Sequence, residues 1–251
     1  MYPQLIQIFG YKIYSYPLFY GLAWGYLTFK AKEIFSRDIS RKKYFWLVWA
    51  IIFLSAWIGA KILFVLINFN LFFNQVSFPN KAWASFALGG GLVFYGGFVS
   101  CGLAICILNK FPQFFTIETF KTLIPYIPMA HAIGRLGCFM AGCCFGKPLS
   151  RSFTFIDFEF TRIPVQIIEA ALLVVFSRIL ILINTNKIPV KMGIIDIYIL
   201  FYSIIRFCLE FLRDDLERGV YYSWISTSQI VALVLISIII IKNLFLKKRF
   251  L

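Results

Sequence analysis

The sequence predicts an all-α integral membrane protein with about seven transmembrane helices, and three observations lead to this fold class. Hydrophobic residues make up 61% of the 251 residues and charged residues only 14%, whereas a soluble domain is usually about 45–50% apolar and about 25% charged. The mean hydropathy is +0.82. Apolar stretches of roughly the 20 residues that cross a bilayer recur along the chain. A water-soluble globule, a disordered chain, a collagen and a disulfide scaffold are therefore excluded.

Seven apolar stretches follow one another between charged or turn-rich connectors. They are residues 13–29, 44–68, 91–108, 119–146, 163–184, 193–212 and 229–246. The first stretch is expected to remain as a span, because the N-terminus lacks the basic start and small-residue cleavage site of a signal peptide. The fourth stretch contains Pro125 and Pro128, so we expect its helix to be kinked or broken.

Together the seven stretches predict a single transmembrane domain over residues 1–251, with outer loops at 69–90 and 147–162. Residues 147–162 alternate aromatic and polar side chains, which predicts a short strand or hairpin near the outer interface.

The positive charge of the chain indicates its orientation. With the N-terminus outside and the C-terminus inside, the inner connectors carry about twice as many Lys and Arg residues as the outer ones, as the positive-inside rule requires. Most of the formal net charge of +14 is then a topology signal, so it gives no reason to expect a nucleic-acid partner.

Polar side chains at helical spacing mark the outer halves of three predicted spans. The fourth span carries His131, Arg135, Cys138 and Gly142, the fifth opens with Arg162, Gln166 and Glu169, and the sixth carries Tyr198, Tyr202, Arg206, Glu210 and Arg213. Charged residues within a membrane are expensive and face the bundle interior or a wet cavity. We expect a polar chamber that is open toward the outer leaflet and holds an anion. The alternative is that Arg206 and Glu210 only lock helices together.

The type of charged residue indicates which anion the chamber would hold. An arginine fork binds phosphate bidentately and stays charged, and the two glutamates would orient the arginines rather than act as bases. Cys138, Cys143 and Cys144 could form a metal or redox site, but three close cysteines and one histidine at a helix end match the four ligands of a metal site poorly. Packing is the favoured interpretation, and we expect no metal and no cofactor.

The run from Gly134 to Pro148 mixes glycine, cysteine and a buried arginine, and here the sequence resembles the prolipoprotein diacylglyceryl transferases. The family signature Gly-Arg-x-Gly-Asn-Phe-x-Asn-x-Glu, which ends in an aromatic-Gly pair, compares with Gly134–Gly146. Further family motifs compare in order with Gly90–Gly97, Arg162–Glu169, Arg206–Arg213 and Ser228-Gln229, and an early Tyr-Gly is similar to Tyr16-Pro17 or to Tyr20-Gly21. The resemblance therefore covers most of the chain.

The chain departs from the family pattern at several polar positions. The family histidine of the glycine-rich segment is Tyr95, and two asparagines and a glutamate after the signature arginine are Cys138, Ala141 and Cys143. The family histidine and tyrosine of the proline motif are Ile163 and Ile168. The scaffold and the arginines match, which is typical of a divergent branch.

The resemblance implies a multi-pass enzyme of the bacterial inner membrane that moves diacylglyceryl from phosphatidylglycerol to the lipobox cysteine of prolipoprotein signal peptides. We expect it to act as a monomer. The residues expected to be catalytic are Arg135, Arg206, Tyr95 and His131. His131 lies one turn before Arg135 on the same face and could stand in for the missing family histidine; the alternative is a hydrogen-bonded packing residue. The residues that the resemblance implies as substrate-binding are Tyr16, Gly96, Gly97, Arg162, Gln166, Glu169, Glu210 and Arg213. Arg135 and Arg206 would hold the lipid phosphate, with Arg162 and Arg213 at the mouth of the chamber.

Two other readings remain open. The first is an enzyme of the same fold that uses another lipid donor or acceptor. The second is a seven-span transporter or receptor, although Lys242 lies too near the inner end of the last span for a Schiff base and the repeated halves of a transporter are not visible.

Overall fold

The structure is a computed structural model that describes residues 4–8, 11–67, 94–155, 158–190, 192–214, 220–221 and 225–248. The chain divides into two compact units. The first comprises residues 1–27 and 121–251, and the second comprises residues 28–120. The predicted outer loop at 69–90 lies outside the described residues.

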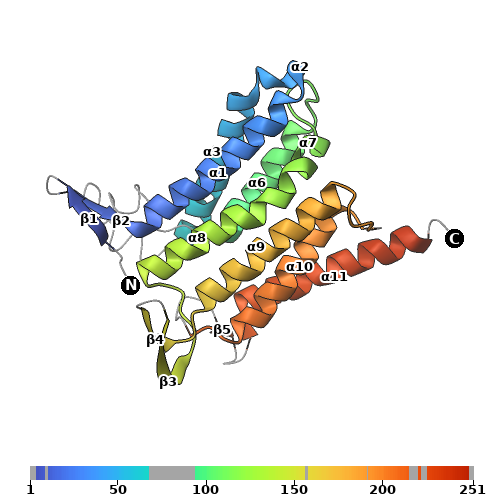
Figure 1. Ribbon diagram of the computed structural model, residues 1–251. Coiled ribbons are helices and arrows are strands. Elements are labelled where there is room, and N and C mark those ends of the chain that lie inside the picture. Colours follow the sequence, from blue (N-terminus) through green and yellow to red (C-terminus); the bar gives the residue numbers. More distant parts are fainter. Residues whose placement is uncertain are drawn as a thin grey trace. The chain divides into compact units, whose positions relative to one another are not determined.

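The helices of the first unit carry most of the polar residues that the sequence predicts for the chamber. They are the second part of α7 (Ile117–Leu123), the 3-10 helix η1 (Ile124–Tyr126), α8 (Ile127–Ala141), α9 (Val165–Asn184), α10 (Ile194–Glu210) and α11 (Thr227–Lys248). Helix α9 packs against α8 and α10, and α10 packs against α11 (Figure 1). Between α9 and α10 the rings of Phe176 and Phe201 stack with their centroids 3.7 Å apart.

The predicted break in the fourth stretch is confirmed. The chain passes from α7 through η1 to α8, with prolines at the start of both η1 and α8. A proline cannot donate a backbone hydrogen bond and so interrupts the helical ladder. The carbonyl of Pro125 accepts a hydrogen bond of 2.6 Å from the hydroxyl of Ser177 on α9. Helix α9 therefore supplies a hydrogen-bond partner to a backbone carbonyl at the break.

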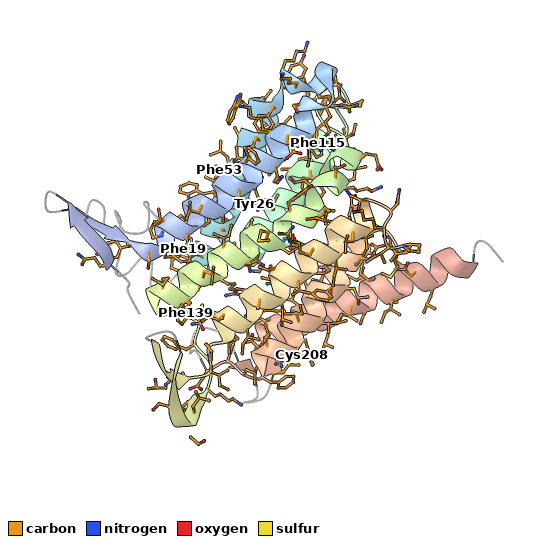
Figure 2. The ribbon with its side chains drawn as sticks, viewed as in Figure 1. Phe19, Tyr26, Phe53, Phe115, Phe139 and Cys208 are labelled. Carbon is orange, nitrogen blue, oxygen red and sulfur yellow. The ribbon has the colours of Figure 1, made fainter. Side chains whose placement is uncertain are left out.

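The N-terminal helix α1 (Ser15–Ser36) meets α8 at a glycine. A Cβ atom placed on Gly137 would lie 2.6 Å from the Cβ atom of Phe19, and Figure 2 shows Phe19 on α1 and Phe139 near the end of α8. No larger residue fits at Gly137 without moving one of the two helices.

The second unit is built around one close helix pair, α3 (Phe45–Ile67) and α6 (Phe94–Leu108), preceded by the short α2 (Ile39–Lys42). A Cβ atom on Gly96 would collide with the carbonyl oxygen of Gly59, and one on Gly97 would lie 2.8 Å from that of Ala56. The hydroxyl of Ser100 donates to the carbonyl of Gly96 at 2.7 Å. Small residues therefore let the two backbones approach, as is common in membrane helix pairs.

Short antiparallel hairpins complete the described chain. They are β1 (Gln4–Ile8) with β2 (Tyr11–Tyr14), β3 (Pro148–Phe155) with β4 (Phe158–Arg162), and β5 (Val220–Tyr221) with β6 (Ile225–Ser226). The pair β3–β4 confirms the hairpin predicted at 147–162.

Each of the seven predicted stretches contains a helix. Three of these helices are long and apolar enough to cross a membrane, namely Phe45–Leu66, Val165–Asn184 and Thr227–Phe245, and Gly96–Leu108 is apolar but shorter. The chain is therefore a mostly helical protein with membrane-spanning helices.

Candidate active site

A cluster of ionised side chains connects α8, α9 and α10. Arg135 on α8 places Nη2 3.0 Å from Oε1 of Glu169 on α9. Arg206 on α10 places Nη1 3.7 Å from Oε2 of Glu169 and Nη2 3.0 Å from Glu210, one turn later on the same helix. Nη2 of Arg206 also donates to the hydroxyl of Ser228 at 3.2 Å. The glutamate of α9 thus bridges the two arginines predicted to hold a phosphate.

The cluster is buried, and its charges determine what it can accept. Glu169 and Glu210 are each 1% exposed and Arg206 is 9% exposed, and buried charges of this kind persist only when they are paired. The two arginines and two glutamates balance. Arg213, 6% exposed, adds a positive charge that acts on Glu169. The five groups together carry a surplus of one positive charge, which favours an anion as ligand.

Two nitrogen atoms of the cluster indicate where an anion would bind. Nε of Arg135 and Nη1 of Arg206 are buried and have no hydrogen-bond acceptor among the residues that the structure describes. A buried donor without an acceptor is costly, so an oxygen-rich ligand that reached them would be strongly favoured. Phosphate oxygens match guanidinium donors in both charge and geometry.

His131 and Tyr16 lie beside this cluster. Nε2 of His131 is 4.0 Å from Oε1 of Glu169, and its ring lies 5.3 Å from that of Tyr202. The ring of Tyr16, at the start of α1, is 3.8 Å from the Cβ position of Gly137, half a turn after Arg135. Both residues belong to the helices that carry or flank the arginines.

Gln166 and Arg162 secure the chain at the end of α8. Gln166, 2% exposed, donates from Nε2 to the carbonyl of Cys143 at 2.6 Å. Arg162 donates to the carbonyl of Gly146 at 3.3 Å and pairs with Asp214 at 3.0 Å. Backbone hydrogen bonds join the same segments, since Gly146 pairs with Arg213 and with the residue after Arg162. Arg162 is therefore bound to two segments of the chain, whereas the sequence predicts it as a substrate-binding residue at the mouth of the chamber.

The predicted residues of the glycine-rich segment lie in the second unit. A Cβ atom on Gly96 or on Gly97 would point into α3. The close packing of α3 against α6 therefore accounts for both glycines. Tyr95 lies in the first turn of α6, and its side chain is outside the described part of the structure. A substrate contact by any of the three stays a prediction.

Three polar residues near the cluster are not among those predicted for the site, although Ser228 and Gln229 compare with a family motif. Ser228 binds Arg206, and Asp214 binds Arg162. Gln229 forms a capping box with Ser226: its Oε1 accepts from the amide of Ser226 at 2.9 Å, and its own amide donates to the hydroxyl of Ser226 at 3.2 Å. The Ser-x-x-Gln spacing is the sequence signal of that cap. Nothing in the sequence marks the other two contacts, which depend on the fold.

Comparison with known proteins identifies the family. The sequence model of the prolipoprotein diacylglyceryl transferase family matches residues 3–244. Proteins named phosphatidylglycerol–prolipoprotein diacylglyceryl transferase resemble the chain over most of its length. The protein of Clostridium tetani is 27% identical over 93% of each chain, that of Clostridium perfringens (transferase 2) is 29% identical over 95% of this chain and 93% of its own, and that of Acinetobacter baylyi is 26% identical over 91% and 86%.

Proposed function

Because the chain belongs to the prolipoprotein diacylglyceryl transferase family, we propose that it transfers the diacylglyceryl group of phosphatidylglycerol to the lipobox cysteine of prolipoprotein signal peptides. It does so as a monomer in the bacterial inner membrane. The names of its relatives give the donor and the acceptor class. The buried arginine pair gives the physical reason why a phospholipid would bind at this place.

The reaction requires charge stabilisation more than any other contribution. A cysteine sulfur attacks the glycerol carbon, a carbon–sulfur bond forms, the carbon–oxygen bond to phosphate breaks, and glycerol phosphate leaves. The thiol proton passes to a base, for which His131 and Tyr95 are the candidates. Fixed positive groups aimed at the leaving phosphate lower the barrier most in a water-poor site, and Arg135 and Arg206 fill that role.

One observation carries the proposal. Arg135 and Arg206 come from different helices, share Glu169, and each keep a buried nitrogen without an acceptor in the described structure. Both nitrogen atoms can donate to an oxygen of a phosphate group. Glu169 and Glu210 then orient the two guanidinium groups for a headgroup, and Arg213 supplies the extra positive charge.

The test is transfer to a peptide. Proteoliposomes containing phosphatidylglycerol and the full-length protein are incubated with a lipobox peptide, and the mass of the peptide is followed. We expect a gain of one diacylglyceryl group. Arg135→Ala should lower the rate at least about a hundredfold.

The matched control is Arg178→Ala, which removes an exposed arginine of the membrane helix α9 and should leave the rate unchanged. Phosphatidylethanolamine vesicles test the alternative of another lipid donor. Full activity of Arg135→Ala, or an unmodified peptide with every lipid, would refute the proposal.

The same function fits a chain with seven spans, its N-terminus outside and its C-terminus inside. Outside the three helices that are long and apolar enough to cross a membrane, α6 and α10 are shorter, the stretch from α7 to α8 is interrupted, and α1 is long but carries Lys30, Lys32 and Glu33. Helices α8 and α10 carry the buried charges. Alkaline phosphatase fused after residue 190 should be inactive, and the same enzyme fused after residue 214 should be active, because it folds only outside the cytoplasm. The reverse pattern of phosphatase activity would show that the chain has the opposite orientation in the membrane.

A further inference from the structure

Three cysteine sulfurs converge where α8 ends. The Sγ atoms of Cys138, Cys143 and Cys144 all lie within 4.8 Å of one another. Cys138 is buried, and Cys143 and Cys144 are half-buried. The sequence favours packing for these residues, because three close cysteines and one histidine at a helix end match the four ligands of a metal site poorly.

A left-handed turn produces the convergence. Helix α8 ends at Gly142, whose φ is 74°, and the amides of Gly142 and Cys143 donate to the carbonyls of Phe139 and Cys138, both at 3.1 Å. This is the Schellman arrangement. Cys144 follows with a φ of 60°, a conformation that residues other than glycine rarely adopt. The chain therefore folds back over the last turn of α8 and returns two thiols to Cys138.

Other contacts hold this turn in place. The amide of Gln166 fixes the carbonyl of Cys143 at 2.6 Å, and the thiol of Cys143 donates to the carbonyl of Cys138 at 3.6 Å. A backbone strained at Cys144 persists only because its surroundings determine it, and such strain is concentrated at ligand sites. A cluster that served only to fill space would not need three sulfurs on an unfavourable turn.

We propose that Cys138, Cys143 and Cys144 form a binding site for Zn²⁺. Zinc–thiolate bonds are about 2.3 Å long, so three sulfurs around one tetrahedral zinc lie about 3.8 Å apart. No two of the three sulfurs are now more than 4.8 Å apart, so each sulfur–sulfur distance would have to shorten by no more than about 1 Å. Soft thiolate ligands select zinc over the hard cations of the cell.

The net charge of the bound state is small and lies near a basic side chain. Binding releases the three thiol protons to solvent and forms three zinc–sulfur bonds, which leaves a net charge of −1 at the site. Arg135 lies one turn before Cys138 on α8 and supplies a neighbouring positive charge. The partial exposure of Cys143 and Cys144 leaves room for water as the fourth ligand that zinc requires.

The experiment uses Co²⁺ as a visible substitute for Zn²⁺. The full-length protein is purified in detergent, reduced, freed of reductant without oxygen, and titrated with Co²⁺. We expect one Co²⁺ per chain, with the thiolate charge-transfer absorbance and strong visible bands of a tetrahedral site, all removed by one equivalent of Zn²⁺. Serine at any one of the three positions should weaken zinc binding at least tenfold.

Two variants separate binding from folding. Cys144→Gly removes a ligand and places at φ 60° the residue that tolerates it, so this variant should unfold at the wild-type temperature or above and still lose the metal. The control replaces Cys101, Cys106 and Cys208 by serine together. These free cysteines lie outside the cluster, with Cys208 on α10 (Figure 2), and the control should keep every cobalt band.

Three outcomes would overturn the proposal. The first is the absence of cobalt–thiolate absorbance in wild-type protein whose thiols are free. The second is loss of the bands in the control variant. The third is a disulfide that joins two of the three cysteines in protein alkylated directly in bacterial membranes. None of these measurements uses lipid transfer, so the zinc site and the transferase function fail or stand separately.

Discussion

Two glutamates of this chain each lie between two basic side chains, in opposite surroundings. Glu33, on the last turns of α1, is 3.0 Å from Lys30 and 3.0 Å from Arg37, and 42% of its side chain is exposed. Glu169 is 3.0 Å from Arg135 and 3.7 Å from Arg206, and 1% of its side chain is exposed. The distances are similar, so burial and the origin of the partners make the difference.

The difference explains which of the two groups can serve chemistry. The partners of Glu33 are close in sequence: Lys30 lies three residues earlier on α1, and Arg37 lies four residues later, directly after the helix ends. Water screens these charges, and the pairs contribute little to stability. The partners of Glu169 come from two other helices. Because Glu169 is buried, water does not screen its interactions with them. A charge in such a place is retained only if it is needed, and it acts strongly on whatever binds.

Removal of the buried carboxylate should have the largest effect. Glu169→Gln leaves two buried guanidinium groups undercompensated, and we expect it to lower the free energy of unfolding by about 3–5 kcal/mol and to abolish lipid transfer. The double variant Arg135→Met with Glu169→Leu removes a whole pair, so it should recover most of the stability but none of the activity. Thermal unfolding in detergent and the peptide assay measure the two effects. Wild-type stability of Glu169→Gln would contradict the role of the cluster.

The next effect tests the close approach that positions Arg135. Gly137→Ala places a methyl group 2.6 Å from Cβ of Phe19 and should cost about 1–3 kcal/mol, as overpacking does. Gly134→Ala, one turn earlier on α8, meets nothing within 4 Å and serves as the control in the same unfolding experiment. Equal stability of the two variants would show that α1 and α8 do not approach at this glycine.

A smaller effect should follow from the loss of one hydrogen bond within the buried cluster. Ser228→Ala removes one of the two partners of Arg206 Nη2, and we expect the free energy of unfolding to fall by about 1–2 kcal/mol. Ser237→Ala, on the same helix, removes only a bond to its own backbone on an exposed face and should change nothing. If both serines tolerate alanine equally, the hydroxyl of Ser228 does not support the arginine.

The exposed carboxylate should give the smallest effect. The hydrogen bond from Lys30, followed by that from Arg37, lowers the pKa of Glu33, which lies beyond the predicted first span. The stability that Glu33 contributes is then present above its unfolded pKa and lost as the pH falls through the lower folded value. Glu33→Gln should therefore lower the unfolding temperature only slightly at pH 7, and it should remove the small loss of stability that the wild type shows as the pH falls. A large shift at neutral pH would refute the contrast with Glu169.

Much of the fold follows from local sequence. The apolar stretches predict the positions of the helices, Pro125 and Pro128 predict the break before α8, and the alternation of residues 147–162 predicts the hairpin β3–β4. In each case a short window of residues determines the outcome, either through hydrophobic length or through a missing backbone donor.

The site follows from sequence only in part. Helical spacing places Arg206 and Glu210 one turn apart, but it cannot reveal that Glu169 bridges to Arg135 on another helix. Likewise, a residue with a left-handed backbone at Cys144 is set by surrounding contacts rather than by its own preference. Arg162 shows the same limit, because its partner Asp214 is 52 residues away in the chain.

The layer beneath the ionic cluster has a consequence for the membrane as a whole. Ala132, one turn before Arg135, packs with Ala170 and Leu173, which follow Glu169 on α9. Further along α9 the hydroxyl of Ser177 donates to the carbonyl of Pro125. A protein that draws a charged headgroup into hydrocarbon would dissipate the proton gradient if its polar groups continued to the opposite side. The side chains of Ala132, Ala170 and Leu173 offer a proton no group to hop to. The ring of Tyr202 packs against them, so this layer insulates the helices below the proposed ligand site wherever the hydroxyl of Tyr202 does not reach.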